Sequence, residues 1–267
     1  MTLQEEGWLA ALDIDGTILH EDGFLSEKVR EAVRRADARG HEVMLATGRS
    51  ADATTPVLDQ LGVTPRYLVC SNGAVTLERD PDSEGTYRRT RVETFDPSEV
   101  LTTIAGALTD AHYAVEDAEG LFRYTERFPE SAVGPGSEVV PFEGLLEVRA
   151  TRVVVISPNH ATEEFLGVVE RMGLQRVSYA IGWTAWLDIA PDGVNKATAM
   201  EWVRTRLDVP IERTVAIGDG RNDIDMLEWA GRGVAMGQAP SDVIAAANET
   251  TRAVRDDGLA VVLDSLP

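Results

Sequence analysis

Short apolar runs alternate with amphipathic stretches over the first third of the chain. A segment that begins at Ser26 has apolar residues at helical spacing and stops near Gly40, and a second helix is expected over about 52–61. Around these helices lie three runs with the length and composition of buried strands, WLAALD (8–13), EVMLAT (42–47) and YLVCS (67–71). Strands that alternate with helices predict parallel pairing through right-handed crossovers, and hence an α/β fold with a doubly wound, Rossmann-like parallel sheet.

The alternation is interrupted near residue 80 by the polar, turn-rich stretch RDPDSEGTYRRT. From there to about residue 187 the pattern predicts an α+β insert, with helices near 97–110 and 160–172 and the strands TYRRTRV, HYAVED, LFRYTE and TRVVVIS. The βα pattern then resumes with a helix over 194–206, the strand TVAIGD (214–219), helices over 223–229 and 240–247, and the short strand GVAM. We therefore predict a core of 1–80 and 188–267, interrupted by a cap domain of 81–187.

Carboxylates follow two of the predicted core strands. WLAALD ends on Asp13, with Asp15 two positions on, and TVAIGD ends on Asp219, with Asp223 at the start of the next helix. The carboxyl ends of parallel strands form one edge of the sheet, where ligands bind in such folds. Like charges gathered there are unfavourable unless a cation, a shared proton or a reaction requires them. The pattern therefore favours a site for a divalent cation.

The residue types at this edge indicate which cation. Oxygen ligands alone, with no clustered His or Cys, favour Mg²⁺ over zinc as the cofactor. Mg²⁺ usually keeps several waters and takes one or two carboxylates together with a substrate phosphate oxygen. We expect the carboxylates of Asp13 and Asp219 and the backbone carbonyl of Asp15 as direct ligands. Asp223 is expected to support the metal directly or through water.

A phosphate bound at this edge would lie within reach of Asp13. The Asp13 carboxylate can attack phosphorus to form an aspartyl-phosphate, while Asp15 donates a proton to the leaving oxygen and later withdraws one from water. The transferring phosphoryl group needs donors that are already positioned. Thr47 supplies a hydroxyl and Lys196 a cation, and Asn222 would hold either Lys196 or the phosphate.

Four further residues at this edge have two interpretations each. Gly48 and Arg49 follow Thr47, and Asn72 and Gly73 follow the strand YLVCS, so all four are candidate substrate contacts. A surface arginine and an ordinary Asn-Gly turn are equally compatible with these positions.

The predicted cap carries three arginines that also have two interpretations. Arg123, Arg149 and Arg152 would meet a distal anionic group of a substrate, or they would be solvated side chains, which are commoner on strands. Which cap residues contact a substrate depends on the side chains that the fold brings together.

Four stretches carry a family resemblance: DIDGT (13–17), ATGRS (46–50), GVNKATAM (193–200) and GDGRNDIDML (218–227). Together they resemble the four motifs of the haloacid dehalogenase superfamily, in its Mg²⁺-dependent phosphatase branch. The long insert and SNGA (71–74) resemble the Cof-type group, whose α/β cap lies between the second and third motifs. The resemblance implies the same roles: Asp13 is the nucleophile and Asp15 the acid/base. Thr47 and Lys196 are implied to bind the phosphate. Asp219 is implied to be a metal ligand, with Asp223 nearby.

Composition narrows the possible partners and compartment. The net charge of −20 argues against a general binder of nucleic acid, because the phosphate backbone would be repelled over most of the surface. No apolar run approaches the roughly 18 residues of a membrane span, and the first residues do not resemble a secretory signal. A single cysteine, Cys70, excludes an intramolecular disulfide framework and fits a reducing cytoplasm. We therefore expect a cytoplasmic protein.

The combined interpretation is a Mg²⁺-dependent phosphatase whose partner is a small phosphorylated metabolite, such as a sugar phosphate. The cap is expected to close over the site and to select the substrate. Two alternatives stay open: a phosphomutase on the same scaffold, and a catalytically idle module that binds a metabolite. Release of inorganic phosphate without a bisphosphate cofactor would distinguish the phosphatase from the mutase. The sequence does not indicate an oligomeric state.

Overall fold

The computed structural model describes residues 7–82, 86–108, 110–126, 128–129, 133–134, 136–158, 162–172, 177–181 and 186–267. The chain divides into two units, a core unit of 1–91 and 195–267 and an inserted unit of 92–194. The expected boundaries at 80/81 and 187/188 differ from these because strand β5 (Tyr87–Val92) extends a core-unit sheet and strand β11 (Trp186–Pro191) pairs within the inserted unit.

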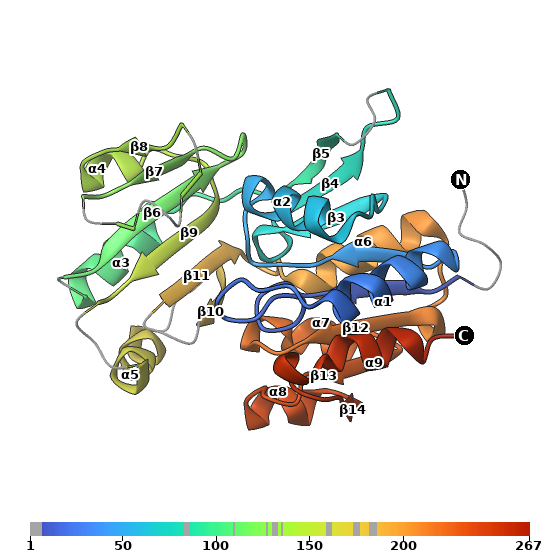
Figure 1. The fold of residues 1–267 in the computed structure, drawn as a ribbon. Helices are drawn as coiled ribbons and strands as arrows, with labels where there is room; N and C mark the ends of the chain where they lie inside the picture. Colours follow the sequence, from blue (N-terminus) through green and yellow to red (C-terminus); the bar gives the residue numbers. More distant parts are fainter. Residues whose placement is uncertain are drawn as a thin grey trace. The chain divides into compact units, whose positions relative to one another are not determined.

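The main sheet of the core unit consists of five parallel strands (Figure 1). Their order is β14 (Glu249–Thr250), β13 (Arg232–Ala235), β12 (Thr214–Gly218), β1 (Leu9–Leu12) and β2 (Glu42–Leu45). Ladder partners align Leu12 with Ile217 on one side and with Leu45 on the other. The residues that follow these three strands therefore emerge together at one edge, as the sequence predicted.

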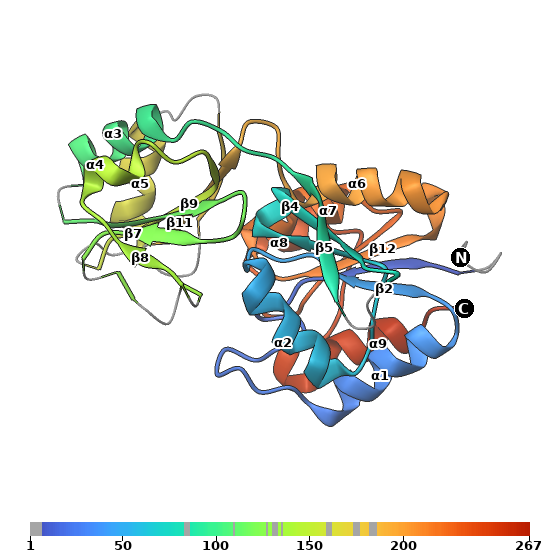
Figure 2. The same ribbon diagram turned by 90° about the horizontal axis from the view of Figure 1, so that it is seen from above.

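Helices cover both faces of this sheet, which confirms the doubly wound α/β architecture (Figure 2). One face packs against α1 (Glu27–Ala38), α2 (Ala51–Leu61) and α9 (Gly258–Asp264). The other face packs against α6 (Lys196–Leu207), α7 (Ile224–Trp229) and α8 (Ser241–Ala246). Helix α1 begins where the sequence predicts, since the Ser26 hydroxyl caps the Val29 amide.

The third apolar run departs from the expected parallel pattern. Strand β3 (Tyr67–Cys70) pairs antiparallel with β4 (Val75–Arg79), and the two form a separate three-stranded sheet with β5. It contacts the main sheet through one parallel bridge between Ala46 and Val69. The run TYRRTRV, which we expected in the cap, thus belongs to the core unit as β5. The local sequence pattern predicts that a segment forms a strand, but it does not predict which strand it pairs with.

The inserted unit is built on one six-stranded sheet with helices α3 (Ser98–Ala107), α4 (Phe142–Leu145) and α5 (Thr162–Met172) on one face (Figure 2). The sheet order is β10 (Val177–Ile181), β11, β9 (Ala150–Ile156), β6 (His112–Asp117), β7 (Phe122–Tyr124) and β8 (Glu138–Val139). Three of these strands were not predicted, β8, β10 and β11. The α+β character matches the sequence interpretation.

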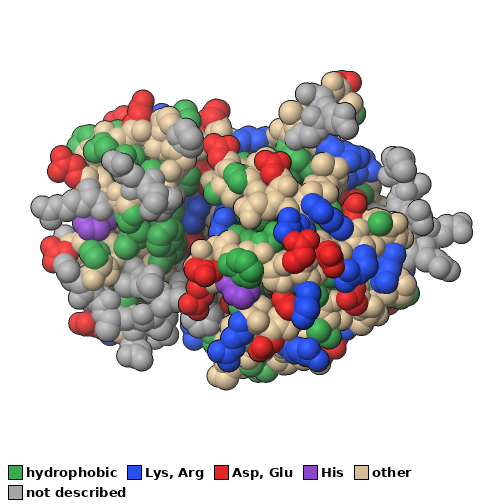
Figure 3. All heavy atoms as spheres, viewed as in Figure 1, with side chains coloured by type: hydrophobic (Ala, Val, Ile, Leu, Met, Phe, Trp, Pro, Cys, Tyr) green, Lys and Arg blue, Asp and Glu red, His purple; other side chains and the backbone are tan. Residues whose placement is uncertain are grey.

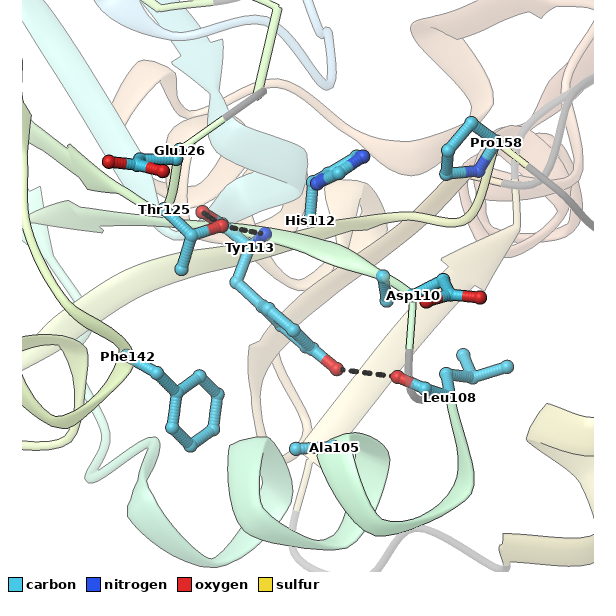
Figure 4. Close-up of a pocket in the computed structure, with 10 residues that line it drawn as sticks. Ala105, Leu108, Asp110, His112, Tyr113, Thr125, Glu126, Phe142 and Pro158 are labelled. Atoms are coloured by element: carbon cyan, nitrogen blue, oxygen red, sulfur yellow. Dashed lines mark hydrogen bonds between the residues drawn. The ribbon is translucent and has the colours of Figure 1, made fainter.

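A cavity of about 630 Å³ lies within the inserted unit, beside α3 and the start of β6 (Figure 4). Tyr113 and Phe142 line it in edge-to-face contact, and the Tyr113 hydroxyl donates to the Leu108 carbonyl at 3.2 Å. Asp110 and Glu126 are its charged members, and no Lys or Arg lies among its described lining residues. The cavity therefore lacks the cation that a phosphate site requires.

Acidic and basic side chains are interspersed over the face of the core unit seen in Figure 3. Many form local pairs, such as Arg35 with Asp264 at 2.9 Å. The negative net charge is therefore not concentrated in one patch on this face. Within the described part of the chain, no helix is long and apolar enough to cross a membrane.

Candidate active site

The loop after β1 brings Asp13 to the edge of the main sheet. Its backbone N–H donates to the Ile217 carbonyl at 3.0 Å, so the loop starts in register with the end of β12. Gly16 has a φ of +82°, and a Cβ on it would lie 2.1 Å from Asp219 Oδ2. Only glycine allows this turn to approach Asp219 so closely. The motif DIDGT thus folds Asp13 against Asp219.

Lys196 is the first residue of α6 and is completely buried. Asn195 caps the helix by accepting from the Thr198 amide at 2.8 Å, which fixes where the lysine side chain starts. The Lys196 Nζ donates to Asp13 Oδ1 at 2.7 Å and to Asp223 Oδ1 at 2.6 Å. The buried ammonium therefore bridges a carboxylate from each of two motifs.

The second oxygen of Asp223 is also satisfied. Its Oδ2 accepts from the backbone N–H groups of Asp219 and Gly220 at 3.0 and 2.9 Å. A Cβ at Gly218 would lie 2.4 Å from the Asp223 carboxyl carbon, so this strand has to end on glycine. These contacts hold Asp223 rigidly beside Lys196.

Asp13, Asp219 and Asp223 can each direct one carboxylate oxygen to a common point, since these oxygens lie within 4.8 Å of one another. All three residues are buried. Three carboxylates form the hard oxygen donor set that suits Mg²⁺. The residues present therefore fit a divalent cation.

Burial and the neighbouring negative charge both raise the pKa values of Asp13 and Asp219. Burial and the neighbouring Asp223 raise the pKa of Asp13 well above its usual value, although Lys196 opposes them. The same two causes raise the pKa of Asp219 to about 7. Lys196 shows the opposite balance: burial lowers its pKa, but Asp13 and Asp223 raise it further, so the ammonium stays charged. One lysine thus does not neutralise three aspartates.

Comparison with known proteins identifies the family. A model of the haloacid dehalogenase-like hydrolases matches residues 10–263. The chain belongs to this family. It is 29% identical, over 97% of both chains, to the 5-amino-6-(5-phospho-D-ribitylamino)uracil phosphatase YitU of Bacillus subtilis (strain 168), and 27% identical, again over 97% of both, to the putative phosphatase YkrA of that organism. The expected enzyme class, a hydrolase of phosphoric monoester bonds, is thereby confirmed.

The fold of this hydrolase is that of solved members of the family. The structure of BT4131, a HAD subclass IIB sugar phosphatase, superposes with a TM-score of 0.79 over 96% of this chain and 98% of that chain. The two sequences are 23% identical, so this likeness concerns the fold alone.

Asp15 does not join the carboxylate cluster of this hydrolase. Its side chain is 63% exposed, and Arg49 binds it through two nitrogens, Nε to Oδ2 at 2.8 Å and Nη2 to Oδ1 at 2.5 Å. Arg49 is therefore neither a free surface arginine nor an unpaired substrate contact. The ion pair fixes the Asp15 carboxylate on Arg49, and the carboxylates that Lys196 binds are those of Asp13 and Asp223.

The second group of predicted residues lies on connected loops. The Thr47 carbonyl accepts from the Asn72 amide at 3.0 Å, and the Asn72 side chain accepts from Asn222 at 3.0 Å. A Cβ at Gly48 would lie 3.2 Å from the Asn72 side chain, so this loop packs closely. Asn222 thus bonds Asn72, whereas the expected partner Lys196 is held by Asp13 and Asp223.

Gly73 has a steric role that the sequence interpretation did not include. Its φ is +102°, and a Cβ there would lie 2.2 Å from the Asn195 carbonyl oxygen. The preceding Asn72 is also left-handed, with a φ of 52°. The Asn-Gly pair therefore forms a tight turn that packs against the start of α6, where Lys196 lies.

Two polar partners of Asp219 were missed. Thr17 donates its hydroxyl to Asp219 Oδ1 at 3.3 Å, and Gln238 donates to Asp219 Oδ2 at 3.3 Å and to the Gly16 carbonyl at 2.6 Å. Gln238 follows β13 and so emerges at the same edge as the aspartates. That position after the strand GVAM was the available signal, but glutamine there suggests no chemistry by itself.

The raised pKa values predict how pH affects the metal-free protein. For Asp219 the folded pKa, about 7, lies above the ordinary 3.8, so its stabilising contribution is complete below about 3.8 and is lost as pH rises through 7. Mg²⁺ would replace the missing positive charge. We expect Mg²⁺ to raise the thermal unfolding midpoint, relative to chelator, more at about pH 8 than at about pH 5.5. An equal increase at both pH values, measured by calorimetry, would contradict this.

Proposed function

We propose that this hydrolase is a Mg²⁺-dependent phosphatase that acts in the cytoplasm on a small phosphomonoester, a sugar phosphate or a related metabolite, through an aspartyl-phosphate. The observation that carries the proposal is the bridge from Lys196 Nζ to Asp13 and Asp223 within a buried cluster of three aspartates. A buried cation beside a carboxylate at a strand end suits the binding of an anionic phosphoryl group next to a nucleophile.

Asp13 is assigned the role of nucleophile. A bond forms between its carboxylate oxygen and phosphorus while the bond from phosphorus to the leaving oxygen breaks. The Lys196 ammonium, 2.7 Å from Asp13 Oδ1, orients this carboxylate and offers its remaining donor capacity to the equatorial phosphoryl oxygens. Thr47 is assigned as a second donor to the phosphoryl group.

Asp15 is assigned proton transfer. It gives a proton to the leaving oxygen and then takes one from the water that hydrolyses the aspartyl-phosphate, which releases inorganic phosphate and restores both carboxyl groups. Its position outside the carboxylate cluster and its 63% exposure support this division, because a leaving oxygen or a water molecule can approach the Asp15 carboxyl from solvent.

Mg²⁺, when bound by Asp13, Asp219 and Asp223, would supply positive charge for the phosphate oxygens. The inserted unit, expected as the cap, is assigned the choice of the leaving group. Its α+β fold supports this assignment, and so does the position of every proposed catalytic and metal-binding residue in the core unit.

A panel of phosphomonoesters tests the proposed function. It should include p-nitrophenyl phosphate, several hexose phosphates and 5-amino-6-(5-phospho-D-ribitylamino)uracil, each assayed for phosphate release with Mg²⁺ and with chelator. We expect Mg²⁺-dependent release of inorganic phosphate with no bisphosphate added. An isomeric sugar phosphate as the product would indicate the mutase instead, and no turnover of any ester would support the idle module.

A further inference from the structure

Three arginines of the inserted unit stood out in the sequence, and each binds a neighbour within that unit. The pairs are Arg123 with Asp117 at 3.1 Å, Arg149 with the Thr94 carbonyl at 3.3 Å and Arg152 with Asp188 at 2.6 Å. None of the three is therefore a simply solvated side chain. A residue of the core unit, Gln238, makes contacts that none of the roles assigned above explains.

Gln238 connects three segments of the core unit through the amide of its side chain. It lies just after β13, in the loop that leads to α8. Its Nε2 donates to the Gly16 carbonyl at 2.6 Å and to Asp219 Oδ2 at 3.3 Å, and its Oε1 accepts from the Val254 N–H at 2.9 Å. One side chain thus joins the turn after β1, the residue after β12 and the segment before α9.

The partners of this amide determine which way it points. An amide oxygen only accepts hydrogen bonds, and an amide nitrogen only donates them. Val254 offers an N–H, whereas Gly16 and Asp219 offer oxygens, so the opposite orientation would set like groups against each other at all three contacts. Methionine has a similar length but no donor and only a weak acceptor, so the chemistry of this position is specific to the amide.

Asp219 is oriented by uncharged side chains. The other two aspartates of the cluster are each bound by the Lys196 ammonium, at 2.7 and 2.6 Å. Asp219 instead accepts from the Thr17 hydroxyl on Oδ1 and from Gln238 on Oδ2. With one donor on each oxygen, the plane of the Asp219 carboxylate is fixed.

The turn that carries Asp13 is held by the same glutamine. A Cβ on Gly16 would lie 2.1 Å from Asp219 Oδ2, so this residue of the turn has no room for a side chain of its own. Its carbonyl accepts from Gln238 instead. Gln238 therefore sets the turn and Asp219 relative to each other, and Asp13 and Asp219 are two of the three carboxylates that fit a divalent cation.

Gln238 is itself anchored by the segment before α9. Its neighbour Gly237 donates its N–H to the Arg252 carbonyl at 3.1 Å. Val254, which binds the end of the Gln238 side chain, begins the 3₁₀ turn η5 (Val254–Asp256). The backbone beside Gln238 and its amide are both fixed, so the position of the amide is set by folding of the core unit.

We propose that Gln238 is a positioning residue for the divalent cation, and that the Val254 N–H supports it from outside the site. The inference rests on the Mg²⁺ site of the proposed function. Gln238 orients Asp219 and the Gly16 turn, so less freedom of the carboxylates is lost when the cation binds. Removal of such outer partners typically weakens metal binding by about 10–100-fold.

Calorimetric titration with Mg²⁺, with no ester present, tests the role of the glutamine. We would compare the wild type with Gln238→Met, which keeps the length of the side chain, and with the control Gln60→Met. Gln60 is exposed on α2. We expect Gln238→Met to raise the Mg²⁺ Kd by about 10–100-fold and Gln60→Met to leave it unchanged. The Mg²⁺ concentration for half-maximal phosphate release should rise in parallel.

Val254→Pro tests the support without altering any side chain at the site. Proline lacks the N–H that binds Gln238, and it is tolerated at the first position of a helical turn. Ala253, which precedes it, already has the extended backbone that proline favours, with φ −66° and ψ 160°. We expect the Mg²⁺ Kd to rise about three- to tenfold. The control Val254→Ala keeps the N–H and should leave the Kd unchanged.

The unfolding midpoint in chelator separates positioning from a purely structural role. A lower midpoint with an unchanged Mg²⁺ Kd makes Gln238 structural and overturns the proposal, and so does a Kd within about twofold of the wild type in Gln238→Met. An unchanged Kd in Val254→Pro alone overturns the support by Val254. If Gln238→Met does not fold, Val254→Pro and Val254→Ala decide by the same criterion.

The same titration distinguishes this inference from the proposed function. A wild type that binds Mg²⁺ but releases phosphate from no ester would reject the phosphatase, and the Kd values would still decide the role of Gln238. A wild type without measurable Mg²⁺ binding overturns the inference.

Discussion

Replacement of Asp13 by asparagine is expected to lower kcat for p-nitrophenyl phosphate by about 10⁴-fold or more, because the amide cannot form the aspartyl-phosphate. The substitution keeps the size of the side chain and removes one of three buried negative charges. Burial and Asp223 raise the pKa of Asp13, so the charge of this carboxylate is unfavourable in the folded metal-free protein even though Lys196 partly compensates it. We therefore expect the unfolding midpoint in chelator to be retained or raised while turnover is lost.

Asp264→Asn is the matched control for this experiment. Asp264 lies in α9, is about half exposed and pairs with Arg35 at 2.9 Å, so its loss should change neither turnover nor stability appreciably. Steady-state assays with Mg²⁺ and thermal unfolding of both variants measure the two effects. Turnover within tenfold of wild type in Asp13→Asn protein would reject Asp13 as the nucleophile.

The core of this fold was predictable because its signals are local. Each buried strand of the main sheet is a short apolar run, and the helices between them begin at residues such as Ser26, whose capping bond the structure contains. Parallel pairing then aligned the strand ends, so Asp13 and Asp219 could be placed at one edge before any contact was known. The parallel pairing expected for strand β3 was wrong, because its antiparallel partner β4 follows directly after a left-handed Asn-Gly turn.

The sequence predicted which residues lie at the site better than it predicted which side chains pair with one another there. The sequence placed Lys196 and four aspartates at the same edge, but the choice of Asp223 over Asn222 as the lysine partner depends on the turn after Gly218. Likewise, the pairing of Arg49 with Asp15 joins residues from two loops whose side-chain directions no pattern gives. Gln238 and Arg152 carry no motif at all, and only the assembled sheets reveal their surroundings.

Lysine is rare in this chain: Lys28 and Lys196 are its only lysines, and arginine supplies the other cations. The use of lysine at position 196 therefore reflects a local requirement. A compact ammonium fits between two carboxylate oxygens at 2.7 and 2.6 Å, whereas the planar guanidinium of arginine is larger and presents its donors as a rigid fork.

Lys196→Met is expected to destabilise the metal-free protein by about 3–5 kcal/mol, because it leaves Asp13 and Asp223 buried without their counter-charge. It should also abolish turnover. Urea unfolding in chelator measures the stability change, with Lys28→Met as the control. The Lys28 side chain is 79% exposed and pairs with Asp257 at 3.4 Å, so its replacement should change the free energy of unfolding by less than about 1 kcal/mol.

The double variant Lys196→Met/Asp13→Asn shows whether unpaired charge is the cause. Removing the Asp13 charge from the Lys196→Met protein eliminates one of the two uncompensated carboxylates, so the double variant should be about 1–3 kcal/mol more stable than Lys196→Met alone. If lost packing were the cause, the double variant would gain no stability over Lys196→Met, because asparagine does not refill the space that the ammonium occupied. A double variant no more stable than the single one would therefore mean that the buried cation contributes chiefly through its contacts, and that its charge is not what balances this cluster.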